Sequence, residues 1–202
     1  MIKKRVITLL SKDIRAKERD LILSATTLFH RYGFSKVSVE EICSRAKVSK
    51  VTFYRYYKSK DELILKIISL LFDDIRSRAW QELNSPLSLK EKFDRVAILK
   101  KEFTELLGEE IISGLFNYPG VQSYYQSLSK QTFEDFKAFL YSQQEEGNIN
   151  SGLNIELFLA LLEELSSIVS RNKLLKHSKS YLDMVSQINE ILISGIFNRD
   201  SE

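Results

Sequence analysis

Apolar residues recur at helical spacing through the first part of the chain. Between positions 14 and 29 they stand three, four or seven residues apart, and Gly33 follows where a glycine commonly ends a helix. This spacing predicts a helix from Ile14 to Phe29. The apolar positions that define it are Ile14, Leu21, Ile22, Ala25, Leu28 and Phe29.

Two short helices are expected next, each introduced by a serine. The run Ser38-Val39-Glu40-Glu41 is a capping box, in which a serine hydroxyl and a glutamate carboxylate satisfy free amides at a helix start. This helix ends near Arg45. Ser49 can cap another helix that runs to about Tyr56. Two short helices about three residues apart are the pattern of a helix-turn-helix.

Longer helical stripes fill the rest of the chain. A second capping box, Ser59-Lys60-Asp61-Glu62, starts a helix to about Leu83, which Asn84-Ser85-Pro86 ends. Further helical patterns cover residues 88–107, 110–117, 120–146, 154–172 and 180–197. We therefore expect an all-α protein of about nine helices. A helix-turn-helix domain would occupy residues 1–60, with its core at 14–60, and a second helical domain would occupy residues 61–202.

Composition agrees with helices, and charge indicates a partner. Two prolines and seven glycines in 202 residues are few for an all-β protein. Residues 1–60 hold 15 Lys or Arg against 5 Asp or Glu, whereas residues 61–202 hold 15 against 22. A basic N-terminal part beside an acidic remainder indicates that the first part meets a polyanion, with nucleic acid as the leading candidate. A basic solvated surface without a partner is the alternative.

The same composition argues against export and membrane insertion. The apolar run Val6 to Leu10 is too short for an export signal, and Leu63 to Phe72 is interrupted by Lys66 and falls short of the roughly 20 residues that span a bilayer. Cys43 is the single cysteine, so no intrachain disulfide is possible. We expect a cytoplasmic protein without a membrane segment.

A distinctive run of residues covers the predicted helix-turn-helix. It includes Ile22-Leu23-Ser24-Ala25, Leu28-Phe29, Gly33-Phe34, Val39, Ile42, Val48-Ser49-Lys50-Val51-Thr52-Phe53-Tyr54-Arg55-Tyr56-Tyr57 and Lys58-Ser59-Lys60-Asp61-Glu62-Leu63. Over these residues the chain resembles the DNA-binding domain of the TetR family of transcriptional regulators, of the TetR/AcrR type. It departs from the family at Val37, Lys47 and Val51, where Thr, Gly and Gly are usual. Lys47 must therefore form the turn without glycine's freedom.

The chemistry of the third helix fits this resemblance. A recognition helix presents short polar or basic side chains to base edges, which Lys50 and Thr52 supply, and it needs an apolar back, such as Phe53. Tyrosine and lysine side chains nearby can bind phosphates, which fix the register on DNA. The resemblance, together with the helix starts, implies that the residues at DNA are Ser38, Ser49, Lys50, Val51, Thr52, Tyr54, Arg55, Tyr56 and Lys60. The basic start, Lys3 to Arg5, is either a minor-groove arm or a solvated tail.

The resemblance also implies a dimer built from the last two helices and an effector site among the middle ones. For the dimer interface we expect Leu157, Leu161, Leu165, Ile168, Met184, Ile188, Ile191 and Gly195, although these apolar stripes can instead cover the subunit's own core. For the pocket we expect Phe103, Phe116, Tyr124 and Phe136, although aromatic residues at helical spacing more often form ordinary core.

These expectations converge on a sequence-specific DNA-binding transcriptional regulator. It would be a homodimeric repressor that a small-molecule effector of unknown identity releases from double-stranded operator DNA. A regulator of the same fold that is controlled by a protein partner is the alternative. The chain has no His-Glu-x-x-His motif, glycine-rich phosphate loop or Cys/His metal spacing, and its two histidines are His30 and His177. We therefore expect neither an enzyme nor a cofactor.

Overall fold

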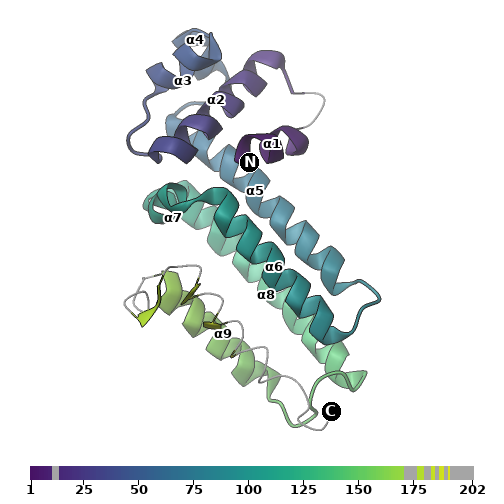
Figure 1. The fold of residues 1–202 in the computed structure, drawn as a ribbon. Coiled ribbons are helices and arrows are strands. Elements are labelled where there is room, and N and C mark those ends of the chain that lie inside the picture. The colour runs from purple at the N-terminus through teal and green to yellow at the C-terminus, as the bar shows by residue number, and fades with distance from the viewer. Residues whose placement is uncertain (11–13, 171–176, 180–182, 185–186, 189–190, 192–202) are drawn as a thin grey trace. The chain divides into compact units, whose positions relative to one another are not determined.

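The computed structural model describes residues 1–10, 14–170, 177–179, 183–184, 187–188 and 191, and in this part of the chain the fold is all-α (Figure 1). The chain divides into two compact units. The first comprises Met1–Trp80 and Glu102–Leu128, and the second comprises Gln81–Lys101 and Ser129–Glu202. Neither unit ends at residue 60, so the units differ from the domains expected over residues 1–60 and 61–202. That expected boundary remains a prediction.

Nine α-helices and one 3₁₀ turn lie within the described residues, which confirms the expected fold class. They are α1 (Ile2–Leu9), α2 (Ala16–Tyr32), α3 (Val39–Ala46), α4 (Lys50–Tyr56), α5 (Lys60–Leu83), α6 (Leu89–Leu107), α7 (Glu109–Gly114), the 3₁₀ turn η1 (Leu115–Asn117), α8 (Pro119–Glu145) and α9 (Ile155–Ser170). From α2 to α9 they follow the order of the sequence-based predictions. The helix expected over 180–197 lies largely outside the described residues.

The first unit is organised around α2, which contacts α1, α3, α4 and α7. Its core collects apolar side chains from α2, from the helix-turn-helix and from the first three turns of α5. The fully buried members include Leu21, Ile22, Phe29, Ile42, Phe53, Leu63, Ile64, Ile67, Ile68 and Leu71. Cys43 is buried among them, and desolvation raises the pKa of its thiol, as expected of a small core residue.

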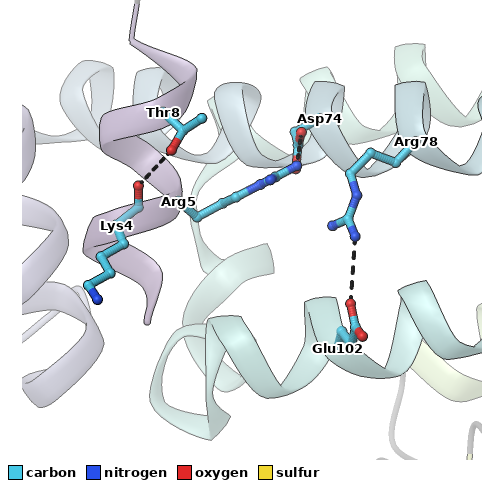
Figure 2. A network of polar contacts seen from close by, with 6 residues as sticks. All are labelled: Lys4, Arg5, Thr8, Asp74, Arg78 and Glu102. Carbon is cyan, nitrogen blue, oxygen red and sulfur yellow. Dashed lines mark hydrogen bonds and ion pairs between the residues drawn. The ribbon is translucent and has the colours of Figure 1, made fainter.

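The start of the chain is a helix, so both expectations for Lys3 to Arg5 were wrong. Ile2, Val6 and Leu10 are buried in the core of the first unit, at the spacing that puts them on one face of α1. The Arg5 guanidinium is bound in a bidentate ion pair to the Asp74 carboxylate on α5, with Nε 2.7 Å from Oδ2 (Figure 2). A segment with a buried face and a fixed arginine is neither a free arm nor a solvated tail.

The second unit has its own apolar core. Its buried side chains come from α6, α8, α9 and the segments between them, and include Leu89, Phe93, Val96, Leu99, Leu140, Ile149, Ile155 and Leu159. Phe93 contacts the rings of Phe136 and Phe139, which are themselves stacked at a centroid distance of 6.2 Å. Throughout the described residues of both units, every helix is too short or too polar to cross a bilayer.

Candidate nucleic-acid interface

The helix-turn-helix is built by its caps and its turn. Ser38 Oγ accepts a hydrogen bond from Glu41 N–H at 3.2 Å, while the Glu41 carboxylate accepts one from Ser38 N–H at 2.7 Å, so the expected capping box is present. The Glu41 carboxylate accepts hydrogen bonds from both the N–H and the hydroxyl of Ser38, and these bonds lower the pKa of Glu41. Lys47, which follows the last residue of α3, has a left-handed backbone conformation, with φ 55° and ψ 42°. It occupies the place that a glycine usually takes.

The turn leads directly into α4 with a second serine cap. Ser49 Oγ accepts a hydrogen bond from Thr52 N–H at 3.1 Å, and the two hydroxyl oxygens are 3.0 Å apart. At the other end, Tyr57 O–H donates to the Glu18 carboxylate on α2 at 3.1 Å. Burial, and then Glu18, raise the pKa of Tyr57, so it stays a neutral donor. The N-terminal end of this seven-residue helix is therefore capped by Ser49, and its C-terminal end is tied to α2.

The two faces of α4 have opposite environments. Phe53 and Tyr57 are buried, as expected of the apolar back. On the other side, 71% of Val51 and 54% of Tyr54 are accessible to solvent, and Lys50 and Arg55 are exposed as well. The buried side chains of Phe53 and Tyr57 pack into the core and hold α4 in place, so that its opposite face remains exposed to solvent.

Two of the expected DNA contacts have additional partners in the protein. Lys60 Nζ donates hydrogen bonds to the backbone oxygens of Phe34 and Val37, at 2.9 and 3.0 Å. Lys50 Nζ forms an ion pair with the Glu40 carboxylate on α3. Lys60 therefore anchors the loop between α2 and α3. Lys50 is already paired with Glu40 in the protein without DNA.

The other expected residues differ in accessibility. Ser49 is exposed, whereas Ser38, Thr52 and Tyr56 are partly buried. The Ser38 hydroxyl donates to Glu41 at 2.8 Å, so a phosphate near α3 would meet backbone amides more readily than this hydroxyl. Phosphate binding by Ser38 and by Lys60 remains a prediction.

Four further basic side chains near these helices were not among the residues expected at DNA. Lys36, Arg45, Lys47 and Lys58 are all exposed on the first unit. A surface depression of about 660 Å³ lies on this unit and is lined by Leu28, Tyr32, Lys36, Glu40, Glu41, Ser44 and Arg45. The excess of basic residues before position 60 was the available signal, but it named no individual residue.

The residues expected at a dimer interface fall into three groups. Leu157 and Leu161 are 60% and 51% exposed on α9, and Ile191 is 71% exposed. Leu165 and Ile188 are partly buried, while Met184 is buried within the single chain. The side chain of Ile168 and the whole of Gly195 lie outside what the structure describes.

The residues expected in an effector pocket divide between the two units. Phe103 and Tyr124 belong to the first, and Phe136 belongs to the second, while the side chain of Phe116 is outside the described part. In the first unit the Phe72 ring of α5 packs edge-on against Phe103 and Tyr125, at centroid distances of 5.4 and 5.6 Å. Tyr124 O–H donates to the Asp73 carboxylate at 2.7 Å.

No cluster of metal-ligating side chains is present among the residues that the structure describes. The first unit presents the helix α4, whose exposed face carries the basic side chains of Lys50 and Arg55. Its chemistry is that of a surface for binding a polyanion.

Comparison with known proteins adds independent findings. Residues 21–67 match the family described as bacterial regulatory proteins, tetR family. The chain is 21% identical over 196 residues to the fatty acid metabolism regulator protein of Bacillus subtilis, covering 93% of this chain and 100% of that protein. It is 30% identical over 99 residues to the uncharacterised regulator YuxN of the same organism, but spans only 32% of that protein and 49% of this chain.

A solved structure shows the same fold. The fatty acid degradation regulator FadR from Bacillus halodurans superposes with a TM-score of 0.66 at 17% sequence identity. The alignment covers 93% of this chain and 100% of that one. The likeness therefore extends well beyond the helix-turn-helix.

Proposed function

We propose that this chain, which belongs to the TetR family of bacterial regulatory proteins, represses transcription as a homodimer that a small-molecule effector releases from its operator. Its relatives are transcriptional regulators and not enzymes. The observation that carries the proposal is the outward face of α4, which is exposed and basic over a buried aromatic back. Such a protein acts in the bacterial cytoplasm, where the DNA is.

On DNA, the residues of α4 have separate tasks. Lys50 and Thr52 stand in the first turn, the part of a recognition helix that enters the major groove. Tyr54 and Arg55 follow on the exposed side and contact phosphates, which fix orientation without reading sequence. Val51 is exposed and apolar, so it can pack against a thymine methyl group.

The dimer is proposed to form through α9 and the helical residues that follow it. Leu157 and Leu161 lie one turn apart on α9, and both remain more than half exposed in the single chain. Apolar side chains at this spacing form a stripe that a second copy can cover. Two recognition helices related by a two-fold axis would bind half-sites about 34–36 Å apart, so the operator is expected to be a palindrome.

The effector is proposed to bind beside α5 in the first unit. The rings of Phe72, Phe103 and Tyr125, here called the Phe72 cluster, supply aromatic surface. Tyr124 and Asp73 supply polar groups, and ligand sites commonly combine the two. The names of two relatives concern fatty acid metabolism and degradation. Fatty acids are therefore the first compounds to test.

The switch is proposed to act through α5. Three residues separate the end of α4 from the start of this helix, whose 24 residues make a rod of about 36 Å. Asp74 binds Arg5 of α1, and Arg78, one turn later, pairs with Glu102 of α6 (Figure 2). The Arg78 Nη2 atom lies 3.6 Å from Glu102 Oε2. An effector that favours another position of α5 would change the spacing of the recognition helices, with a coupling energy typically of about 1–3 kcal/mol.

Control by a protein partner is the second candidate. Ile98 on α6 is 57% exposed and Tyr141 on α8 is 39% exposed, so the second unit presents apolar surface beyond the stripe of α9. A partner protein that covers these side chains would take the effector's place in the switch.

Genomic DNA footprinting with the purified full-length chain tests the function. We expect protection of a short palindrome upstream of a gene, with release on adding the effector in a screen that begins with fatty acids. Enrichment of no genomic fragment over bulk DNA would contradict operator binding. Protection that a bound protein relieves, and that small molecules leave unchanged, would favour the second candidate.

A further inference from the structure

Glu40 differs from its neighbour Glu41 in what its carboxylate does. Glu41 accepts hydrogen bonds from the backbone and the hydroxyl of Ser38 and so completes the cap of α3. Glu40 reaches across the turn and pairs with Lys50, the first residue of α4. The cap of α3 is therefore complete without the Glu40 side chain, whose partner is a residue proposed to contact bases.

We propose that Glu40 is a positioning residue that determines specificity: it holds the Lys50 ammonium away from phosphates, so that Lys50 adds to operator binding but little to binding of random DNA. The proposal rests on the proposed function, because it takes α4 as the recognition helix.

The electrostatic reason is a competition between two anions. Phosphate contacts supply essentially all of the affinity for random DNA, and a lysine is a flexible point charge that can reach any nearby phosphate. A carboxylate beside the ammonium already satisfies it, so exchanging the carboxylate for a phosphate gains little. A guanine edge in the operator is different, because its N7 and O6 atoms accept hydrogen bonds from a lysine without having to displace a full negative charge.

Both groups are ionised around neutral pH, as this competition requires. The hydrogen bond from Lys50 lowers the pKa of the Glu40 carboxyl, and the same bond raises the pKa of the Lys50 ammonium. Each shift moves the pKa farther from neutrality. Both groups are therefore charged at the pH at which the protein would bind DNA.

A purely structural role for the pair is disfavoured by its exposure. The side chains of Lys50 and Glu40 are 54% and 59% accessible, and exposed ion pairs add little to folding. Glu40→Gln keeps the length of the side chain and its hydrogen-bonding oxygen while removing the charge. We expect this variant to melt at the temperature of the wild type.

The experiment compares an operator, selected from a random library by the wild-type chain, with a scrambled duplex of equal length and composition. Affinities are measured at several salt concentrations for the wild type, Glu40→Gln, Lys50→Ala and the double variant. Asp61→Asn is the matched control, because it removes one exposed carboxylate from the first turn of α5.

For Glu40→Gln we expect tighter binding to the scrambled duplex and little change on the operator, so the specificity ratio falls. Once freed, Lys50 adds one phosphate contact, which steepens the slope of log affinity against log salt concentration on the scrambled duplex by about 0.9. The loss of affinity between 50 and 200 mM salt then grows by a factor of about three to four. In the Lys50→Ala background, the same substitution should leave the ratio unchanged.

Two results would overturn the inference. One is an equal gain on both duplexes, matching Asp61→Asn, which would be a general charge effect. The other is the same loss of specificity with Lys50 already removed. A wild-type chain that selects no operator would instead contradict the proposed function itself. The selection with the wild-type chain is therefore completed before any variant is measured.

Discussion

Lys47 has a left-handed backbone conformation, which residues other than glycine seldom adopt. It ends α3 with φ 55°, and its N–H and that of Val48 bond to carbonyls of the last turn of α3, at 3.2 Å to Ser44 and 3.0 Å to Cys43. This is the hydrogen-bond pattern that usually has glycine at the left-handed position. The sequence showed where the turn lies, and the structure shows that lysine adopts the conformation regardless.

Replacing Lys47 by glycine should stabilise the protein. A left-handed non-glycine residue costs about 1–2 kcal/mol, and glycine's greater freedom in the unfolded chain offsets about half of that, so we expect a gain of about 0.5–1 kcal/mol in the free energy of unfolding. Lys47→Ala removes the same charge but keeps the strain. Chemical denaturation that gave both variants equal stability would show that the backbone conformation costs nothing here.

Other residue roles could not be found from the sequence because their partners are distant along the chain. Lys60 binds the carbonyls of Phe34 and Val37, 26 and 23 residues earlier. The pairing of Lys50 with Glu40 spans the turn of the helix-turn-helix. Patterns of residue type predicted which side chains lie near DNA, but not which of them the protein already holds.

At the scale of elements, capped helices were predictable and α1 was not. Ser38, Ser49 and Ser59 each precede a helix start, and the structure places α3, α4 and α5 directly after them. The first residues lack such a signal, and α1 has no side-chain cap. The anchor of α1 is Asp74, 69 residues away from Arg5, so no local pattern could reveal it.

The ion pair between α1 and α5 should contribute measurably to folding. Asp74 is only 12% accessible, so removing Arg5 leaves a mostly buried carboxylate without its bidentate donor. Arg5→Met should lower the free energy of unfolding by about 1.5–3 kcal/mol, the range for hydrogen bonds to charged groups. Lys4→Met is the matched control, since Lys4 is the exposed neighbour on α1 (Figure 2). Equal losses for the two variants in urea denaturation would mean that the pair adds nothing.

At the scale of the whole molecule, the comparisons support a regulator, and two of the similar proteins match over 93% of this chain. Charge had indicated the DNA-binding part, because the basic excess ends near residue 60. Packing divides the chain differently, since the first unit also includes residues 102–128. The Phe72 cluster therefore belongs to the same unit as the helix-turn-helix, an arrangement formed by segments that are far apart in sequence.

The oligomeric state should depend on the exposed stripe of α9. Leu161→Glu places a charge in the proposed interface and should convert the dimer to a monomer in sedimentation velocity at micromolar concentration. Ile98→Glu makes the same change at a similarly exposed position on α6 and should leave the dimer intact. A dimeric Leu161→Glu protein would exclude this face as the interface.

The central claim is that the exposed face of α4 reads the operator, and base-by-base specificity measures it most directly. Binding to every single-base variant of the selected operator is compared for the wild type, Lys50→Ala and Tyr54→Phe. Lys50→Ala should flatten the preference at one symmetric pair of positions, at about 1–3 kcal/mol if the base contact is direct, whereas Tyr54→Phe should weaken all sequences alike. If Lys50→Ala weakened every sequence equally and preserved the full base preference, α4 would not read the operator through Lys50.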